Sequence, residues 1–280
     1  MKITTKLAGT ALIAALGMGA VLPQVAKADT DSLTGKGKVE FTKSSSSSTS
    51  HTNPSGGSNS GDVTDSSAGN SNSSNGEFGI DYVTNLDFEK HGIIASNASP
   101  NTYWASTWVA NKGAADEVKN AHHVTFHDLR NTLDHTYEIS AEITRQFNTA
   151  ESPKEIKEGL ELKGSTITYK EISIAPGEGF GKIDELDLTP TGLKQDVIVK
   201  FGESTPVLTN TKPAGYTEPR FNTGYGEYSL MFGKYNAVPE QDTSAKSVML
   251  TIPRGSTNAV INEGVYHAEI TWTMSETPAV

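Results

Sequence analysis

The sequence predicts an all-β fold, an antiparallel β-sandwich of immunoglobulin-like or jelly-roll-like type that is preceded by a disordered linker. From Phe78 onward, short runs of alternating apolar and polar residues are separated by clusters of Gly, Pro, Asn and Asp, which is typical of sandwiches. The clearest runs lie at 136–144 and 265–274, where apolar residues recur at every second position, as a strand with one buried face requires. One stretch near 150–161 carries charge at helical spacing, but a proline and a glycine interrupt it. We expect a loop or a single helical turn there.

Residues 1–28 have the features of a secretory signal peptide. Two lysines begin the segment, and residues 7–16 form an apolar run that is too short to span a bilayer. Ala26-Lys27-Ala28 then supplies the small-x-small pattern of a cleavage site. The alternative is a retained membrane anchor, but we expect a secreted chain.

The chain is acidic and contains no cysteine. It has 23 basic and 33 acidic residues and a formal charge of −10, which becomes −13 when the three lysines of the signal peptide are removed. An acidic surface repels phosphate backbones, so nucleic acid is not an expected partner, and acidic teichoic polymers are disfavoured for the same reason. The lack of cysteine excludes disulfides and thiolate chemistry, and a domain of this length can bury a core without them.

Residues 29–42 form an N-terminal segment with one candidate β-strand, because Val39 and Phe41 alternate with polar residues. Residues 43–77 form a tract of Ser, Gly, Asn and Thr in which one valine and one alanine are apolar. Such a composition buries too little surface to offset the entropy of ordering, so a disordered linker is predicted. Because a lone strand is not stable in water, we expect strand 37–42 to pair with an edge of the following domain and to shield it.

Residues 78–280 are predicted to form a single β-domain. In its last strand, five apolar residues from Tyr266 to Met274 share one face. The expected strands lie near 79–83, 93–95, 103–109, 123–129, 136–144, 165–174, 195–201, 228–232, 246–252 and 265–274.

Several stretches together match the pattern of a known family. They are 247–253, 264–275, the signal peptide, the polar linker, Gly37-Lys38-Val39-Glu40-Phe41-Thr42, Leu86-Asp87-Phe88 and Asp128-Leu129-Arg130-Asn131. In this order they resemble the WxL-domain surface proteins of Gram-positive bacteria over most of the mature chain. The resemblance implies a cell-wall-binding β-domain that attaches non-covalently to peptidoglycan and assembles with other cell-surface proteins.

The family is named for two Trp-x-Leu motifs, and this sequence departs from both. The second reads Trp272-Thr273-Met274, where methionine replaces leucine at similar volume. The first aligns best with Tyr137-Glu138-Ile139, where tyrosine stands in place of tryptophan. Two roles stay open: Tyr137, Ile139, Trp272 and Met274 build the core between two sheets, or Tyr137 and Trp272 form an exposed platform for a sugar ring.

The other two tryptophans, Trp104 and Trp108, lie four positions apart on one side of the expected strand 103–109, with Ser106 between them. This arrangement suits a glycan-stacking surface and equally suits the edge of a core. The candidate contacts with wall glycan are therefore Trp104, Trp108, Tyr137 and Trp272.

Metal binding and catalysis find no support in the sequence. His122, His123, His127 and His135 lie close together, but their spacing matches no recognised metal site, so we expect exposed histidines without a metal and no cofactor. There is no Gly-x-Ser-x-Gly elbow, Walker loop or His-Glu-x-x-His helix. We expect no catalytic residues and no enzyme activity.

The sequence thus predicts a secreted protein of the cell wall or cell surface that binds peptidoglycan and takes part in a surface protein complex. No LPxTG-like sorting motif precedes Val280, so we expect non-covalent attachment. An alternative of a different class is an adhesin for host extracellular-matrix molecules. A wall-polysaccharide hydrolase is the third candidate, because the separation of two carboxylates in space decides that chemistry.

Overall fold

The computed structural model describes most of the chain from Thr30 to Glu276. The expected signal peptide, the expected strand 93–95 and most of the stretch 150–161 lie outside the described residues. The described residues are 30–40, 51–54, 57–58, 62–63, 65, 67–72, 76–92, 100–150, 160–177, 181–183, 186–254, 258 and 261–276.

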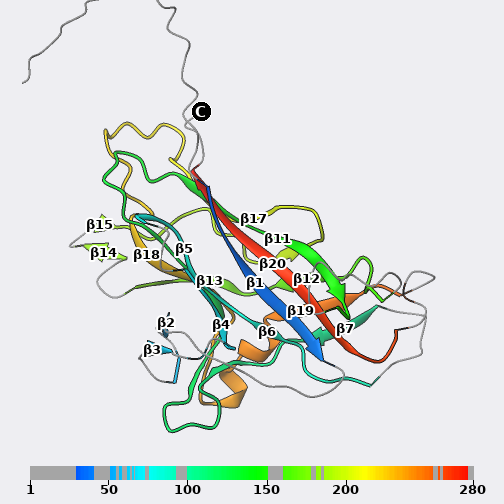
Figure 1. The fold of residues 1–280 in the computed structure, drawn as a ribbon. Coiled ribbons are helices and arrows are strands. Elements are labelled where there is room, and N and C mark those ends of the chain that lie inside the picture. The colour runs from blue at the N-terminus through cyan, green and yellow to red at the C-terminus, as the bar shows by residue number, and fades with distance from the viewer. Residues whose placement is uncertain are drawn as a thin grey trace, which may run out of the picture.

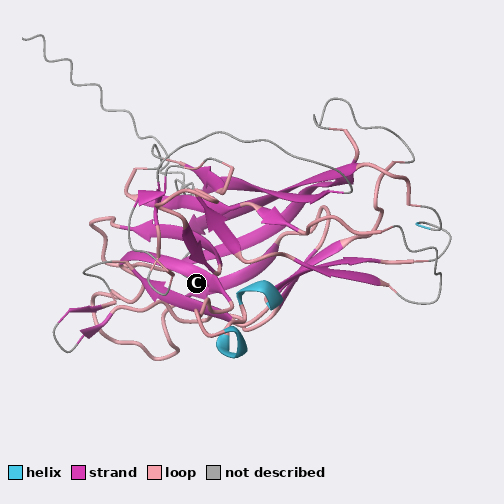
Figure 2. Cartoon of the chain, turned by 90° about the horizontal axis from the view of Figure 1, so that it is seen from below, coloured by secondary structure: helices cyan, strands magenta, loops and turns pink. Residues whose placement is uncertain are grey.

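Strands dominate this part of the chain (Figure 2), and the predicted all-β class with several antiparallel sheets is confirmed. Two short 3-10 turns, η2 (Pro239–Gln241) and η3 (Ser244–Lys246), precede a strand near the C-terminus. Among the described residues, no helix has the length and apolar character needed to span a membrane.

The first sheet has the strand order β17-β11-β20-β1-β6. Its strands are β17 (Thr205–Asn210), β11 (Tyr137–Asn148), β20 (Val265–Glu276), β1 (Thr30–Glu40) and β6 (Leu86–Asp87). Figure 1 shows β11, β20 and β1 side by side, and β1 pairs antiparallel with β20 along its whole length. The expected pairing of the N-terminal strand with the domain is confirmed, although the strand covers 30–40 rather than 37–42 and also pairs in parallel with β6.

Glycines explain how β1 fits into this sheet. Leu33, Gly35 and Gly37 pair with inward-facing residues of β20. A Cβ at Gly35 would collide with Val83, and one at Gly37 would lie 2.9 Å from Ile270 Cδ1. The alternation of β1 was partly hidden in the sequence because two of its inward positions, 35 and 37, are glycines, which carry no apolar side chain.

The second sheet has the order β13-β18-β10-β5-β4 and the third has the order β16-β12-β19-β7. The second consists of β13 (Ile172–Pro176), β18 (Gly226–Phe232), β10 (His122–Asp128), β5 (Phe78–Thr84) and β4 (Gly69–Ser71). The third consists of β16 (Val197–Val199), β12 (Thr166–Tyr169), β19 (Val248–Ile252) and β7 (Asn101–Trp104). Three small pairs complete the fold: β2 (His51–Thr52) with β3 (Asp62–Val63), β8 (Trp108–Ala110) with β9 (Val118–Asn120), and β14 (Lys182–Ile183) with β15 (Leu186–Asp187).

Two expected strands are each divided in the structure. The stretch 165–174 becomes β12 and β13, which belong to different sheets, and Glu171 between them has a φ of 51°. The stretch 103–109 divides between β7 and β8 because the intervening backbone bonds elsewhere: the Ala105 amide donates to the Val248 carbonyl and the Ser106 amide to the Asp87 carbonyl.

One hydrophobic core joins the three large sheets. At its centre Trp272 stacks on Phe232 with ring centroids 5.6 Å apart, and it meets the edge of Tyr169 at 5.3 Å. These three residues come from one sheet each, so packing around Trp272 holds all three sheets together.

In its described part, the tract 43–77 differs from the expected linker. Val63 and Ala68 are buried in a second cluster with Tyr82 and Trp108, and the Trp108 indole donates to the Ala68 carbonyl at 2.8 Å. Averaged composition did not reveal this packing, because it rests on the only two apolar residues of the tract.

Candidate functional site

The two Trp-x-Leu-like motifs lie next to each other in the first sheet. Ile139 of β11 is directly opposite Met274 of β20, and Ala141 is opposite Trp272. Tyr137, Ile139, Trp272 and Met274 are all 1% exposed or less. The structure thus places the four motif residues in the core, where they present no surface to a ligand.

Tyr137 occupies its core position with its hydroxyl paired. The hydroxyl donates to the Gly224 carbonyl at 3.3 Å, and the ring meets the edges of Phe78 and Phe126. Burial raises the pKa of Tyr137 well above its ordinary value, so the hydroxyl remains a donor. A tyrosine at this position therefore satisfies its polar atom inside the core.

The two other tryptophans do not form a single platform. Trp108 is 3% exposed and packs against Tyr82 and His123, whereas Trp104 is 40% exposed. Of the four residues expected to contact glycan, Trp104 is the one that offers an exposed ring.

Trp104 belongs to a row of residues across the outer face of the third sheet. The register aligns Ile198 of β16, Thr168 of β12, Met249 of β19 and Trp104 of β7. Ile198 is 53% exposed, Met249 is half-buried and Thr168 is buried. We call this set the apolar row.

A second row lies beside the apolar row on the same face. Thr166, Thr251 and Thr102 are aligned in register two positions along from it, and all three are exposed or half-buried. We call this set the hydroxyl row. Exposed apolar side chains beside a line of hydroxyls suit a sugar, whose ring carries C–H faces and a rim of hydroxyl groups.

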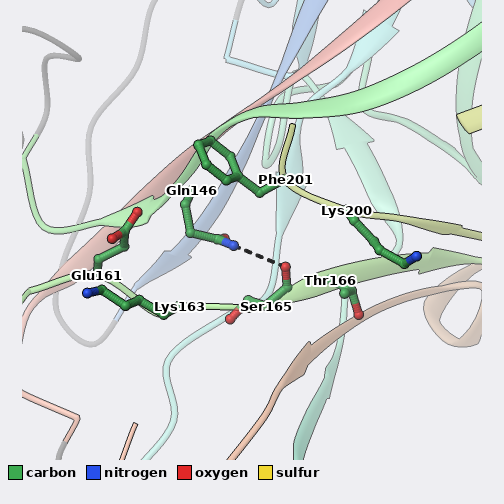
Figure 3. A pocket seen from close by; sticks show the side chains of 8 residues that line it. Gln146, Glu161, Lys163, Ser165, Thr166, Lys200 and Phe201 are labelled. Carbon is green, nitrogen blue, oxygen red and sulfur yellow. Dashed lines mark hydrogen bonds between the residues drawn. The ribbon is translucent and has the colours of Figure 1, made fainter. Parts of the chain in front are cut away.

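A cavity of about 420 Å³ adjoins this face at Thr166 (Figure 3). Its described lining comes from three places in the chain, namely β11, the segment that leads into β12, and the end of β16. The lining residues are Gln146, Glu161, Lys163, Gly164, Ser165, Thr166, Lys200 and Phe201. Phe201 is 55% exposed, so the cavity lining contributes an exposed aromatic ring in addition to Trp104.

A larger hollow of about 600 Å³ lies near the same end of β11, where Arg145, next to Gln146, is part of its lining. Both charges line it, with Lys36 and Arg145 among the bases and Asp87 and Glu269 among the acids. The tryptophan there is the buried Trp108. This hollow therefore offers no exposed aromatic ring, and we take the outer face of the third sheet as the candidate site.

The histidines are placed differently from the expectation of exposed side chains. His122, His123 and His127 are buried because β10 is covered on both faces, and His135 is buried beside Asp128. Burial lowers the pKa of His122 to about 4 and that of His123 to about 3. In the part of the chain that the structure describes, no three His, Asp or Glu residues are grouped as a metal site requires.

Sequence reasoning missed the structural role of Asp128-Leu129-Arg130. Arg130 is bonded to Asp128 Oδ2 at 2.7 Å and also pairs with Glu276 at the end of β20, while His135 Nδ1 lies 2.9 Å from the same Asp128 oxygen. Burial raises the pKa of Asp128, but the bonds from Arg130 and His135 outweigh it and leave the pKa lowered. This buried ion cluster fastens the end of β20.

In a comparison with known families, one family model matches nearly the whole chain. The family model described as WxL domain surface cell wall-binding matches residues 28–278. That range includes β1, both motif strands and the whole candidate site. No curated protein and no solved structure matches the chain.

Proposed function

Since the chain belongs to the WxL-domain family of surface cell-wall-binding proteins, we propose that it binds peptidoglycan non-covalently through the outer face of the third sheet. The family is one of wall-binding domains and not of enzymes. The proposed act is therefore adhesion, with no bond made or broken.

One observation carries the choice of this face. Trp104 has an exposed ring in register with Met249 and Ile198, beside the hydroxyl row. A sheet face of this kind matches an extended glycan strand, because the apolar row runs across four strands and the hydroxyl row across three, so they offer repeated contacts. Each contact adds a small increment, and an exposed aromatic residue commonly supplies the largest one.

The motif residues have a different role in this proposal. Trp272, Met274, Tyr137 and Ile139 join β11 to β20 and fill the space between sheets. They support wall binding by holding the third sheet in place, and their replacement acts on the ligand only through the fold.

The setting of the protein follows from the same resemblance. We propose that residues 1–28 direct export and that the mature protein resides at the cell wall, where it joins other surface proteins in a complex. Peptidoglycan is its first partner in this scheme, and contact with host matrix proteins is left as an alternative without structural support.

Sedimentation with purified peptidoglycan tests the proposed function. The mature chain should co-sediment with sacculi from which teichoic polymers have been removed, and a chaotropic wash should release it intact. Failure to co-sediment would refute peptidoglycan as the ligand. Resistance to the wash would refute non-covalent binding.

A further inference from the structure

We propose that the cavity beside Thr166 is a subsite for a carboxylate group of the wall polymer. This inference rests on the proposed function and names the chemistry of its second contact. The cavity volume of about 420 Å³ lies within the range of sites for small molecules.

Among the described residues, one buried hydroxyl beside the cavity lacks a hydrogen-bond partner. Ser165 lines the cavity and is 1% exposed, yet among the described residues its Oγ has no hydrogen-bond partner. Buried hydroxyls in folded proteins are nearly always paired, because leaving one unpaired costs free energy. Because this Oγ is itself buried, a group that enters the cavity would pair with it once the Ser165 side chain turns toward the cavity.

Gln146, which also lines the cavity, has hydrogen-bonding capacity that the protein does not use. The Gln146 side chain has one acceptor oxygen and two N–H donors. Its oxygen accepts from the Phe147 amide at 3.0 Å, and its Nε2 donates to the Ser165 carbonyl at 3.2 Å, as Figure 3 shows. Gln146 therefore keeps one N–H donor and one lone pair on its side-chain oxygen.

The cavity lining is charged. Lys163 and Lys200 line the cavity against one acid, Glu161, in a chain whose formal charge is −10. Lys200 is 3.1 Å from Glu203, but this pair is well exposed and so only weakly bound. The lining residues themselves carry one positive charge in excess, and together with the N–H donor of Gln146 this favours a carboxylate over an ammonium group.

One side of the cavity is apolar. Phe201 presents an exposed ring, which suits the carbon atoms next to a carboxylate, as in an alanine residue or a lactyl ether. Peptidoglycan carries alanine residues on its stem peptides and lactyl ethers on the muramic acid units, and both branch from the glycan strand that would lie on the apolar row. Thr166 lines the cavity and belongs to the hydroxyl row beside the apolar row, so one polymer reaches both.

Calorimetry with soluble peptidoglycan fragments tests this subsite. The mature chain is titrated with muramyl-peptides that carry free carboxylates and with the same fragments after amidation. We expect the free acids to bind at least about tenfold more tightly, and the difference to shrink as salt is raised. A polymer of uronic acids forms a third arm: its binding in place of the muramyl-peptides would assign the carboxylate to a saccharide source. Equal affinity for free and amidated fragments would overturn the proposal.

Two substitutions assign the effect to the cavity. Ser165→Ala removes the unpaired hydroxyl and should weaken binding of the free acids severalfold without lowering the melting temperature. Lys163→Gln should do the same and also reduce the salt dependence, while Lys234→Gln, an exposed lysine outside the cavity, serves as control. If Ser165→Ala and Lys163→Gln bind as the parent does, the subsite is refuted. Continued co-sedimentation of these variants with sacculi would leave the proposed function standing.

Discussion

Ile139 and Met274 lie directly opposite each other on the neighbouring antiparallel strands β11 and β20. They are the last residues of the two motifs that stand for Trp-x-Leu in this chain, so two motifs far apart in sequence are adjacent in the fold. Both side chains are fully buried. The pair of motifs is therefore one structural unit of the core. Substitution of a motif residue should first lower the free energy of unfolding.

Replacing Trp272 with alanine should destabilise the fold strongly. Its ring packs on Phe232 and Tyr169, and truncation of a large buried aromatic residue costs about 3–5 kcal/mol. Chemical denaturation measures the loss, and Trp272→Phe should cost clearly less. An unchanged unfolding midpoint together with lost wall binding would show instead that Trp272 is a contact residue.

A side chain at Gly35 should weaken the attachment of β1. A Cβ there would collide with Val83 of β5, so Gly35→Ala should lower the melting temperature, while Lys36→Ala at the exposed neighbouring position should change it little. Deleting residues 29–40 should go further and expose the edge of β20, which promotes association between copies. Thermal unfolding and size-exclusion chromatography measure the two effects. A monomeric deletion variant with an unchanged melt would show that β1 has no structural role.

Stability should fall as the pH drops from about 6.5 toward 4. Burial lowers the pKa of His122 to about 4 and that of His123 to about 3, so below pH 6.5 the unfolded chain binds protons that the folded chain does not. Each histidine then removes up to about 1.4 kcal/mol per pH unit. Burial lowers the pKa of His127 as well, but the bond to Asp81 outweighs it and leaves that pKa raised. Protonated His127 therefore stabilises the fold at low pH, and this contribution is lost as the pH rises.

Urea unfolding at pH 7.5, 6 and 5 measures this dependence. His123→Phe, which keeps an aromatic ring against Tyr82 and Trp108, should flatten the profile. A free energy of unfolding that is constant over this range would contradict the buried, neutral state of the two histidines.

Removing Arg130 should leave a buried carboxylate without its main partner. Arg130 bonds Asp128 and Glu276 and lies 3.9 Å over the Phe78 ring. Arg130→Ala should therefore cost on the order of 3 kcal/mol, whereas Leu129→Ala at the exposed neighbouring position should cost much less. Comparison of the two variants by denaturation makes the test. Equal stabilities would mean that the ion cluster does not fasten the end of β20.

The sequence predicted those elements whose apolar residues alternate without interruption. The start of β11 and both ends of β20 were placed within two residues, because every second side chain faces the core, whereas β11 runs four residues beyond its expected end. The division of 165–174 could not be predicted, since it depends on a left-handed conformation at Glu171 and on pairing with two different sheets. Burial of the histidines on β10 was missed for a similar reason, because polar side chains on a strand give no sign that both its faces are covered.

The candidate site was predicted only in part. Trp104 was singled out, but its separation from Trp108 depends on the backbone bonds of Ala105 and Ser106 with distant strands. Ile198 and Phe201 lie in the run Val197-Ile198-Val199-Lys200-Phe201. Because residues 197–199 are all apolar, the run does not show which side chains face outward. The register of four strands assembles the apolar row, and no local pattern contains that information.

The measurement that tests the account most directly is the affinity of the Trp104→Ala variant for purified peptidoglycan. We expect the variant to unfold at the same temperature as the parent chain and to bind sacculi at least about tenfold more weakly, because this exposed ring is the aromatic member of the apolar row. Leu133→Ala, which removes another exposed apolar side chain, should bind as the parent does. Unchanged binding by the folded Trp104→Ala variant would contradict the assignment of the wall-binding surface to the outer face of the third sheet.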